Sequence, residues 1–285
     1  MLSIRRFKSF IPTCPSPSYD TGCTYCETPK FPANKQIDFE KNLNNTKALP
    51  WKHLISLTHG AKDMETMPSK IELVPGSLNE RLNLLRLQFS PHHPIMISNM
   101  IFNNQDEFLN RYKVTGQEQL VMLIPDYKIV KFNIDNTAGF IQRYLIPKEG
   151  IRQIYNPFKR KESVAQIEKE IADDPNAFEE HAMERDMIAI CGHFQRDIRC
   201  GELAPLINEE LIRVIDRNQL DIDVGLISHI GGHAYAGNLI YFPLGEDSIW
   251  YGRVFPNKVQ GIINETVKRK RIIKDMYRGN VAENT

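Results

Sequence analysis

Short apolar runs, rich in β-branched and aromatic side chains, recur through residues 51–158. Such runs predict strands, here at His53–Thr58, His93–Phe102, Leu120–Pro125 and Tyr127–Asn133. The last two form a predicted hairpin across Pro125 and Asp126. Residues 77–88 instead carry leucines at positions 78, 82 and 85, which is the spacing of one helix face. We therefore expect a small N-terminal α/β domain over residues 51–158.

The pattern becomes sharper from residue 187 onward. Strands are predicted at Met187–Ile190, Val224–Ile230, Asn238–Phe242 and Ser248–Phe255, and helices at Leu206–Ile215 and Val259–Met276. The order strand, helix, three strands, helix favours an α/β fold with a mixed sheet flanked by helices. A thioredoxin-like topology is one candidate for a C-terminal domain over residues 187–285. No internal repeat is visible in the sequence.

Two further segments lack these patterns. Residues 1–50 are rich in Pro, Ser, Asn and Thr, which predicts an irregular arm, either disordered or draped over the rest. The first 13 residues hold three basic and no acidic side chains in an amphipathic order, as in a mitochondrial presequence or a solvated tail. Residues 159–186 hold nine acidic against five basic side chains, which predicts a charged helical connector between the two domains.

Composition excludes several classes of function. Thirty-six Lys and Arg against 35 Asp and Glu leave a net charge of +1, so no global field attracts nucleic acid or an anionic membrane. Apolar runs such as Leu120–Ile124 are far shorter than the roughly 20 residues that a membrane-spanning helix needs. The basic run Lys268–Arg271 has no accompanying aromatic side chains on which bases stack, so we expect no nucleic-acid partner.

Four side chains form the main candidate site. Cys191-Gly-His-Phe-Gln-Arg-Asp-Ile-Arg-Cys200 places two thiols in a predicted loop after one strand, and Ser228-His-Ile-Gly-Gly-His233 places two imidazoles at the end of another. Two thiolates and two neutral imidazoles are a complete set of four ligands for a soft or borderline metal. The successive glycines Gly231 and Gly232 disfavour a helix between the histidines and permit a tight turn close to a bulky group.

Three interpretations of these four residues remain open from the residues alone. A zinc site is one, although zinc-finger cysteines usually lie two to four residues apart and eight residues separate Cys191 from Cys200. A [2Fe-2S] cluster with two cysteine and two histidine ligands is the second, and the residues favour it as much as zinc. A Cys191–Cys200 disulfide is the third and the least favoured, because it leaves the histidines unexplained.

The two segments resemble the two signature motifs of the sucrase/ferredoxin-like family. The members of this family are thioredoxin-like ferredoxins. Trp250-Tyr-Gly-Arg-Val and Asp275-Met-Tyr-Arg-Gly279 further resemble one fungal branch of that family. The resemblance extends from about Ile188 to Gly279 and implies a [2Fe-2S] cluster whose ligands are Cys191, Cys200, His229 and His233.

The resemblance also bears on the neighbours of these ligands. His193 follows Cys191 as in a Rieske motif, but no matching second motif exists, so we expect it beside the ligands or on the surface. Arg196 and Arg199 are expected to offset cluster charge or to face a partner, with Asp197 fixing one of them. The alternative is a solvated loop with a local ion pair. Gly231 and Gly232 are expected to let the backbone approach the cluster.

The expected function is that of a one-electron carrier coupled to proton uptake, in mitochondrial redox or thiol homeostasis, or otherwise in the cytoplasm. Its partners would be a protein electron donor and a protein acceptor, neither identified by a motif. Two alternatives are a zinc-stabilised interaction module and a thiol–disulfide oxidoreductase that works through Cys23 and Cys26, a C-x-x-C pair in the arm. No nicotinamide, flavin or Ser-His-Asp pattern is present, so we assign no substrate turnover.

Overall fold

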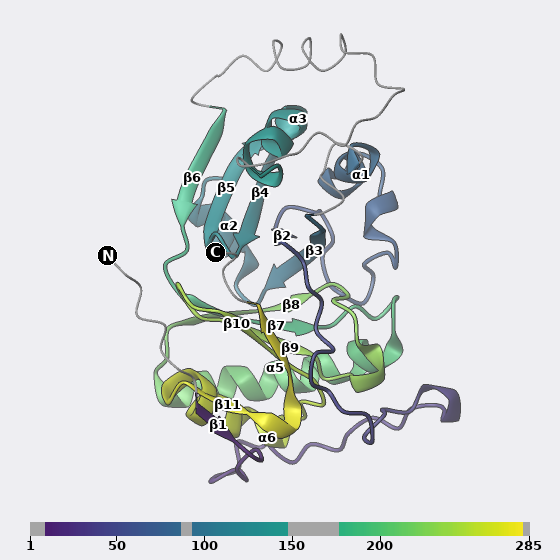
Figure 1. Cartoon of the computed structure of the whole chain (residues 1–285), viewed down its shortest axis with the longest axis vertical. Coiled ribbons are helices and arrows are strands. Elements are labelled where there is room, and N and C mark those ends of the chain that lie inside the picture. The colour runs from purple at the N-terminus through teal and green to yellow at the C-terminus, as the bar shows by residue number, and fades with distance from the viewer. Residues whose placement is uncertain (1–8, 87–92, 148–176, 282–285) are drawn as a thin grey trace.

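A mixed sheet of ten strands forms the centre of the computed structural model, which describes residues 9–86, 93–147 and 177–281 (Figure 1). The strand order is β12-β10-β9-β7-β8-β3-β2-β4-β5-β6. The strands are β2 (Lys52–Ser56), β3 (Ile95–Phe102), β4 (Glu118–Ile124), β5 (Lys128–Asn133), β6 (Phe178–Ala182), β7 (Asp186–Cys191), β8 (Ile222–Ile227), β9 (Leu239–Phe242), β10 (Ser248–Tyr251) and β12 (Tyr277–Val281). A separate parallel pair joins β1 (Ser9–Ile11) to β11 (Arg271–Ile273).

Helices flank this sheet. They are α1 (Leu78–Leu84), α2 (Gln105–Arg111), α3 (Thr137–Phe140), α5 (Ile198–Asn218) and α6 (Pro256–Gly261). Turns of π-helix continue α3 through Ile141–Leu145 and α6 through Ile262–Lys268. Single 3₁₀ turns occupy Ala33–Lys35, Ile71–Leu73, Ile134–Asn136, His233–Tyr235 and Lys274–Met276. None of the helices in the described part of the chain has the length and apolarity that a membrane crossing requires.

Two parts of the sheet share one topology. In the first part β2 and β3 are parallel, β4 is antiparallel to β2, and β5 is antiparallel to β4. In the second part β7 and β8 are parallel, β9 is antiparallel to β7, and β10 is antiparallel to β9. A helix follows the first and the fourth strand of each part, which is the arrangement expected of a thioredoxin-like unit. No internal repeat in the sequence accompanies this structural repeat.

The two parts meet through their second strands. β3 and β8 pair antiparallel, with Met100 opposite Ile227. The α/β fold with a mixed sheet flanked by helices is therefore confirmed. The division into two domains stays a prediction, because one sheet and one hydrophobic core run through both parts.

Strand β4 shows how the hydrophobic pattern builds two cores. Leu120, Met122 and Ile124 face the large core that both parts share. Val121 and Leu123 alternate with them and pack in a second core beneath α1 and α3. This is the period of two expected of a strand covered on both faces.

The predicted connector over residues 159–186 is wrong at its C-terminal end, and its residues up to 176 lie outside the described part. Phe178–Ala182 is an edge strand, β6, and not a helix. Its acidic side chains have partners across the sheet: Glu180 binds Lys128 and Glu179 binds Lys131. Charged side chains are typical of edge strands, where they oppose pairing with another chain.

The predicted closing helix over Val259–Met276 is also too long. The helical segment ends at Lys268, and β11 and β12 follow it. Ile272 and Ile273 are buried because β11 pairs with β1, more than 250 residues earlier in the chain. Arg269 and Arg271 of the basic run bind the buried Glu265.

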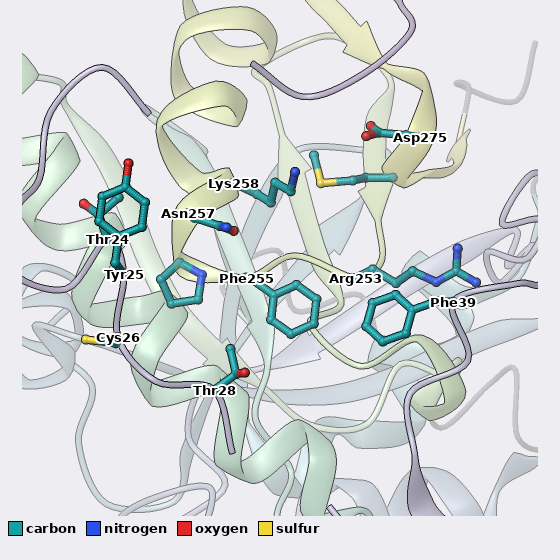
Figure 2. Close-up of a pocket in the computed structure, with 12 residues that line it drawn as sticks. Thr24, Tyr25, Cys26, Thr28, Phe39, Arg253, Phe255, Asn257, Lys258 and Asp275 are labelled. Atoms are coloured by element: carbon teal, nitrogen blue, oxygen red, sulfur yellow. The ribbon is translucent and has the colours of Figure 1, made fainter. Parts of the chain in front are cut away.

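The arm is draped over the C-terminal part. Asp38 N donates to Ala234 O at 2.8 Å, and Arg253 Nε donates to Asp38 O at 2.6 Å. The arm and the C-terminal part together border a cleft of about 590 Å³ (Figure 2). Of the two states expected for this segment, the draped one holds for residues 9–50.

Candidate metal centre

The site lies at the C-terminal ends of two neighbouring parallel strands, where ligand sites commonly form in α/β sheets. Cys191 is the last residue of β7, and its N–H donates to Asn238 O at 2.9 Å. β8 ends at Ile227, two residues before His229. The hydrophobic runs of both strands therefore end at, or just before, a candidate metal ligand.

Cys200 lies in the first turn of α5, and not in a loop as the sequence predicted. The helix begins eight residues before the predicted start at Leu206, because Asp197 caps it by accepting a hydrogen bond from Arg199 N at 3.0 Å. Pro205 lies inside this helix, which is why the sequence favoured a later start. The thiol thus projects from a capped helix that the core holds in place.

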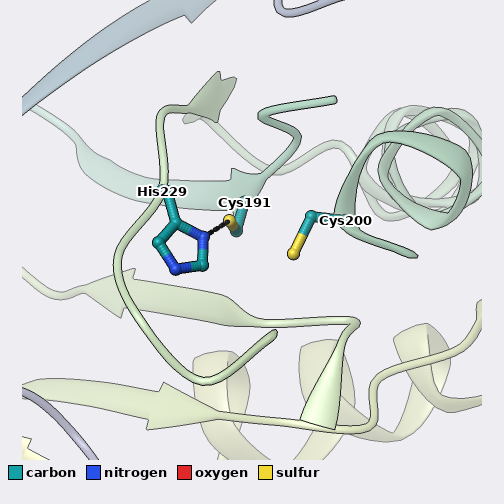
Figure 3. A group of neighbouring side chains, drawn as sticks. All are labelled: Cys191, Cys200 and His229. Atoms are coloured by element: carbon teal, nitrogen blue, oxygen red, sulfur yellow. Dashed lines mark hydrogen bonds between the residues drawn. The ribbon is translucent and has the colours of Figure 1, made fainter. Parts of the chain in front are cut away.

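Three of the four predicted ligands lie together (Figure 3). The sulfurs of Cys191 and Cys200 and one ring nitrogen of His229 are all within 4.8 Å of one another. Cys191 Sγ is 4.0 Å from His229 Nδ1. Both cysteines are buried free thiols, so the disulfide interpretation finds no support here.

The two thiols perturb each other. The hydrogen bond from the Cys200 thiol holds the pKa of Cys191 well below its usual range, despite complete burial. The same contact, together with burial, raises the pKa of Cys200 well above its usual range. The pair therefore readily holds one thiolate, the form in which sulfur binds a metal.

His233 lies just outside this three-residue group. Its ring stacks beside that of His229 with centroids 5.5 Å apart, and its side chain is exposed whereas that of His229 is half-buried. Partial desolvation of its ring lowers the pKa of His233, which favours the neutral imidazole that binds metals. The four side chains thus form two pairs, with the sulfurs in the core and the imidazoles toward solvent.

His193 is engaged by backbone groups at both ring nitrogens. Its Nε2 lies 3.2 Å from Met67 O and 3.1 Å from Pro68 O, which assigns the ring proton to Nε2. Its Nδ1 accepts from His229 N at 3.2 Å. Its place is beside the ligands, where it orients the backbone of His229.

The remaining predicted neighbours divide into two groups. Asp197 and Arg199 form a buried bidentate pair, with Nε–Oδ1 and Nη2–Oδ2 distances of 2.9 Å. Arg199 also donates to Gln36 O of the arm at 2.9 Å. Arg196 is exposed and points its charge to solvent.

Arg278 is a site residue that the sequence analysis missed. Its side chain is 1% exposed, and it donates to Asn238 Oδ1 at 2.7 Å and to Gly231 O at 3.2 Å. It thereby ties the loop that carries both histidines to strand β12. The signal in the sequence is its place in the motif Asp275–Gly279, which carries part of the family resemblance.

Cys23 and Cys26 lie apart from these ligands. They form a pair of their own in the arm, with a Sγ–Sγ distance of 3.1 Å.

Comparison with known proteins shows which proteins this chain resembles. A family model described as sucrase/ferredoxin-like matches residues 43–279. Proteins named altered inheritance of mitochondria protein 32 are similar over nearly the whole chain. The one from Meyerozyma guilliermondii is 47% identical over 99% of both chains, that from Clavispora lusitaniae 46% over 97% of both, and that from Debaryomyces hansenii 45% over 97% of this chain and 98% of its own. No solved structure gives a significant match. The resemblance inferred from the motifs is confirmed.

Proposed function

The chain belongs to the sucrase/ferredoxin-like family, and on this premise we propose that it is a [2Fe-2S] electron carrier with Cys191, Cys200, His229 and His233 as ligands. The observation that carries the proposal is the convergence of two buried sulfurs and an imidazole nitrogen within 4.8 Å. These atoms come from two strand ends and one capped helix, which are rigid supports for a metal centre.

The donor set fits this group. A two-iron centre divides its ligands into two sets, and two imidazoles can replace two thiolates on one of the irons. The cysteine pair in the core and the stacked histidine pair beside it match such a division. His193 is not included, because both of its ring nitrogens already have backbone partners.

A bound cluster of this kind would store and release one electron at a potential raised by its neutral imidazole ligands. The chain supplies the rest. The buried Arg278 cation favours the more negative, reduced state. The exposed ring of His233 can exchange a proton with water, which couples electron uptake to proton uptake.

The electron partners are proposed to be proteins that approach the histidine side of the site, because the cysteine side is buried. We also propose that the cluster-binding part begins near residue 187. The names of the relatives refer to inheritance of mitochondria, which supports a mitochondrial location. The role that we propose there, in redox or thiol homeostasis, rests on the cysteine and histidine ligands.

A zinc-stabilised interaction module is the second candidate. The favouring observation is that three ligand atoms within 4.8 Å also suit a single zinc ion, which binds Cys and His at about 2.0–2.3 Å. Zinc has no redox chemistry, so the two candidates differ in every electrochemical measurement.

Potentiometric titration of anaerobically purified protein tests the proposal. We expect a single one-electron transition whose midpoint falls by up to about 59 mV per pH unit where a ligand imidazole titrates. His229→Cys and His233→Cys should each keep a cluster, lower its potential and flatten this pH dependence. His193→Gln serves as the matched control and should keep the pH dependence. A protein without a redox transition, or histidine variants with the wild-type potential, would contradict the proposal.

A further inference from the structure

The arm carries a second pair of sulfurs in near contact. Cys26 Sγ lies 3.1 Å from Cys23 Sγ, and Cys26 N donates to Cys23 O at 3.1 Å, which closes a tight turn between them. A disulfide has an S–S length of about 2.05 Å, so the two sulfurs need to approach by only about 1 Å. Both are free thiols in the structure.

This turn is fixed to the core. Thr24 Oγ1 donates to the buried carboxylate of Glu210 in α5 at 2.8 Å, and Thr21 Oγ1 also donates to that carboxylate. Cys23 Sγ lies 3.7 Å from Leu206 O of the same helix. Gln260 of α6 donates to Tyr19 O at 2.7 Å and lies beside the same Thr24 hydroxyl and Glu210 carboxylate. The two sulfurs are therefore held together by the fold and do not depend on chance encounters in a loose segment.

The two thiols differ in access. Cys23 is 0% exposed, whereas Cys26 is half-buried at the surface. Burial, with a smaller effect of the Cys26 thiol, raises the pKa of Cys23 to about 12. An external sulfur can reach Cys26 and not Cys23, which is the asymmetry between an attacking and a resolving cysteine.

The cleft between the arm and the C-terminal part begins at Cys26 (Figure 2). Cys26 lies at the border of the cleft, and its sulfur is turned away from the ring of Phe255. Tyr25, Phe39 and Phe255 supply aromatic surface, and Arg253, Lys258 and Asp275 are the charged side chains of the cleft. Arg253 pairs with Asp38 at 3.9 Å, whereas Lys258 forms no ion pair among the described residues. Aromatic surface with two cations against one carboxylate suits a peptide that carries a carboxylate.

We propose that Cys23 and Cys26 form a thiol–disulfide exchange site that is separate from the metal centre. Its substrates are disulfides formed by the cysteine residues of peptides. The Cys26 thiolate attacks one sulfur of the substrate disulfide, whose S–S bond breaks to give one thiolate product and a mixed disulfide on Cys26. Cys23 then attacks Cys26 Sγ, and the second substrate thiolate leaves. Two electrons pass from the cysteine pair to the substrate, and the two thiol protons end on the two products.

Equilibration of the full-length, metal-loaded protein with mixtures of reduced and oxidised glutathione tests this site. After acid quenching and alkylation, mass spectrometry of the peptide that holds both cysteines should show one cooperative change from two alkylated thiols to a disulfide. Cys23→Ser should accumulate glutathione on Cys26, because the resolving sulfur is missing. Cys26→Ser should leave Cys23 unmodified. The matched control is Cys14→Ser, which removes a buried thiol outside the pair and should leave the transition unchanged.

Two substrates identify the group attached to the substrate disulfide. Lys258→Gln should slow reaction with oxidised glutathione severalfold and leave reaction with the uncharged hydroxyethyl disulfide unchanged. With a cysteine peptide disulfide whose carboxylates are blocked, Lys258→Gln should react at the wild-type rate, as with hydroxyethyl disulfide. This comparison shows whether a small carboxylate-bearing thiol or a cysteine within a protein chain is the substrate. Retention of both alkylated thiols in the most oxidising mixture, or independent glutathione addition at both sulfurs, would overturn the proposal. The wild-type titration decides this even if Cys23→Ser fails to fold.

Discussion

Arg278 lies so close to Gly232 that a Cβ atom on the glycine would be 2.5 Å from its Nη2. The same guanidinium donates to the carbonyl of Gly231, and Asn238 Nδ2 donates to the carbonyl of Gly232 at 2.9 Å. One buried cation thus closes the turn that separates His229 from His233. Gly232 is required here for the approach of a side chain from β12, in addition to any approach to a bound centre.

Gly232→Ala should weaken the metal centre, because the new methyl group collides with Arg278 at a residue whose φ is +80°. Gly231→Ala is the matched control, since its φ is +81° but nothing lies within 4 Å of the added Cβ. The control should cost about 1–2 kcal/mol from backbone strain alone. Gly232→Ala should cost more and should lower the metal content per chain, as measured by urea unfolding and elemental analysis. Equal losses in the two variants would show that the Arg278 contact is unimportant.

Arg278→Lys and Arg278→Gln separate the charge of this residue from its hydrogen bonds. Both should reduce stability, because Asn238 Oδ1 and Thr46 O lose donors in the core. Only Arg278→Gln removes the positive charge near Cys191 and Cys200, so only this variant should lower the reduction potential markedly. The comparison is made by potentiometric titration at one pH. A wild-type potential in Arg278→Gln would rule out the electrostatic role.

Asp197 should matter for the position of Cys200. Burial alone would raise the pKa of Asp197, but the hydrogen bonds from Arg199 outweigh it and lower the pKa. Asp197→Asn keeps an acceptor for the helix cap and loses the charge, whereas Asp197→Ala loses both. The alanine variant should therefore be less stable than the asparagine variant by about 1 kcal/mol, measured by urea unfolding. Equal stability would mean that Asp197 does not fix the start of α5.

His53 should make stability depend on pH. Burial lowers its pKa from 6.5 to about 3, while its Nδ1 has no hydrogen-bond partner in the described structure. Between these two values the unfolded chain binds a proton that the folded chain does not, so stability falls as pH falls. From pH 7 to pH 5 this group should remove about 2 kcal/mol.

His53→Gln provides the comparison, since the amide can replace the contact with Ser98 and does not titrate. Its unfolding free energy should fall less than that of the wild type between pH 7 and pH 5, with other groups contributing equally to both. Parallel pH profiles would contradict the burial of a neutral His53.

The sequence predicted the position of a ligand correctly where that ligand follows an apolar run. The apolar runs of β7 and β8 end at Cys191 and just before His229, so both residues were expected at strand ends. Cys200 lies in a helix and not in the predicted loop. Pro205 is an unusual residue in a helix interior and disfavours an earlier helix start, but the cap at Asp197 establishes that start.

Contacts between segments that are distant in the sequence cannot be predicted from local residue patterns. β11 takes a strand partner from residues 9–11, and Arg278 reaches the histidine loop from the edge strand β12. The charged sequence of β6 is typical of a solvated helix. It forms a strand because Lys128 and Lys131 of β5 lie opposite its acidic side chains, and local sequence does not show this pairing. The shared topology of the two sheet parts depends on strand pairing and leaves no trace in residue spacing.

Binding of a [2Fe-2S] cluster is tested by the low-temperature EPR spectrum of the dithionite-reduced, anaerobically purified protein, with iron, acid-labile sulfide and zinc measured on the same sample. We expect two irons and two sulfides per chain and a spin-one-half signal that is lost in Cys191→Ala and Cys200→Ala. A colourless, EPR-silent protein with one zinc per chain would contradict cluster binding.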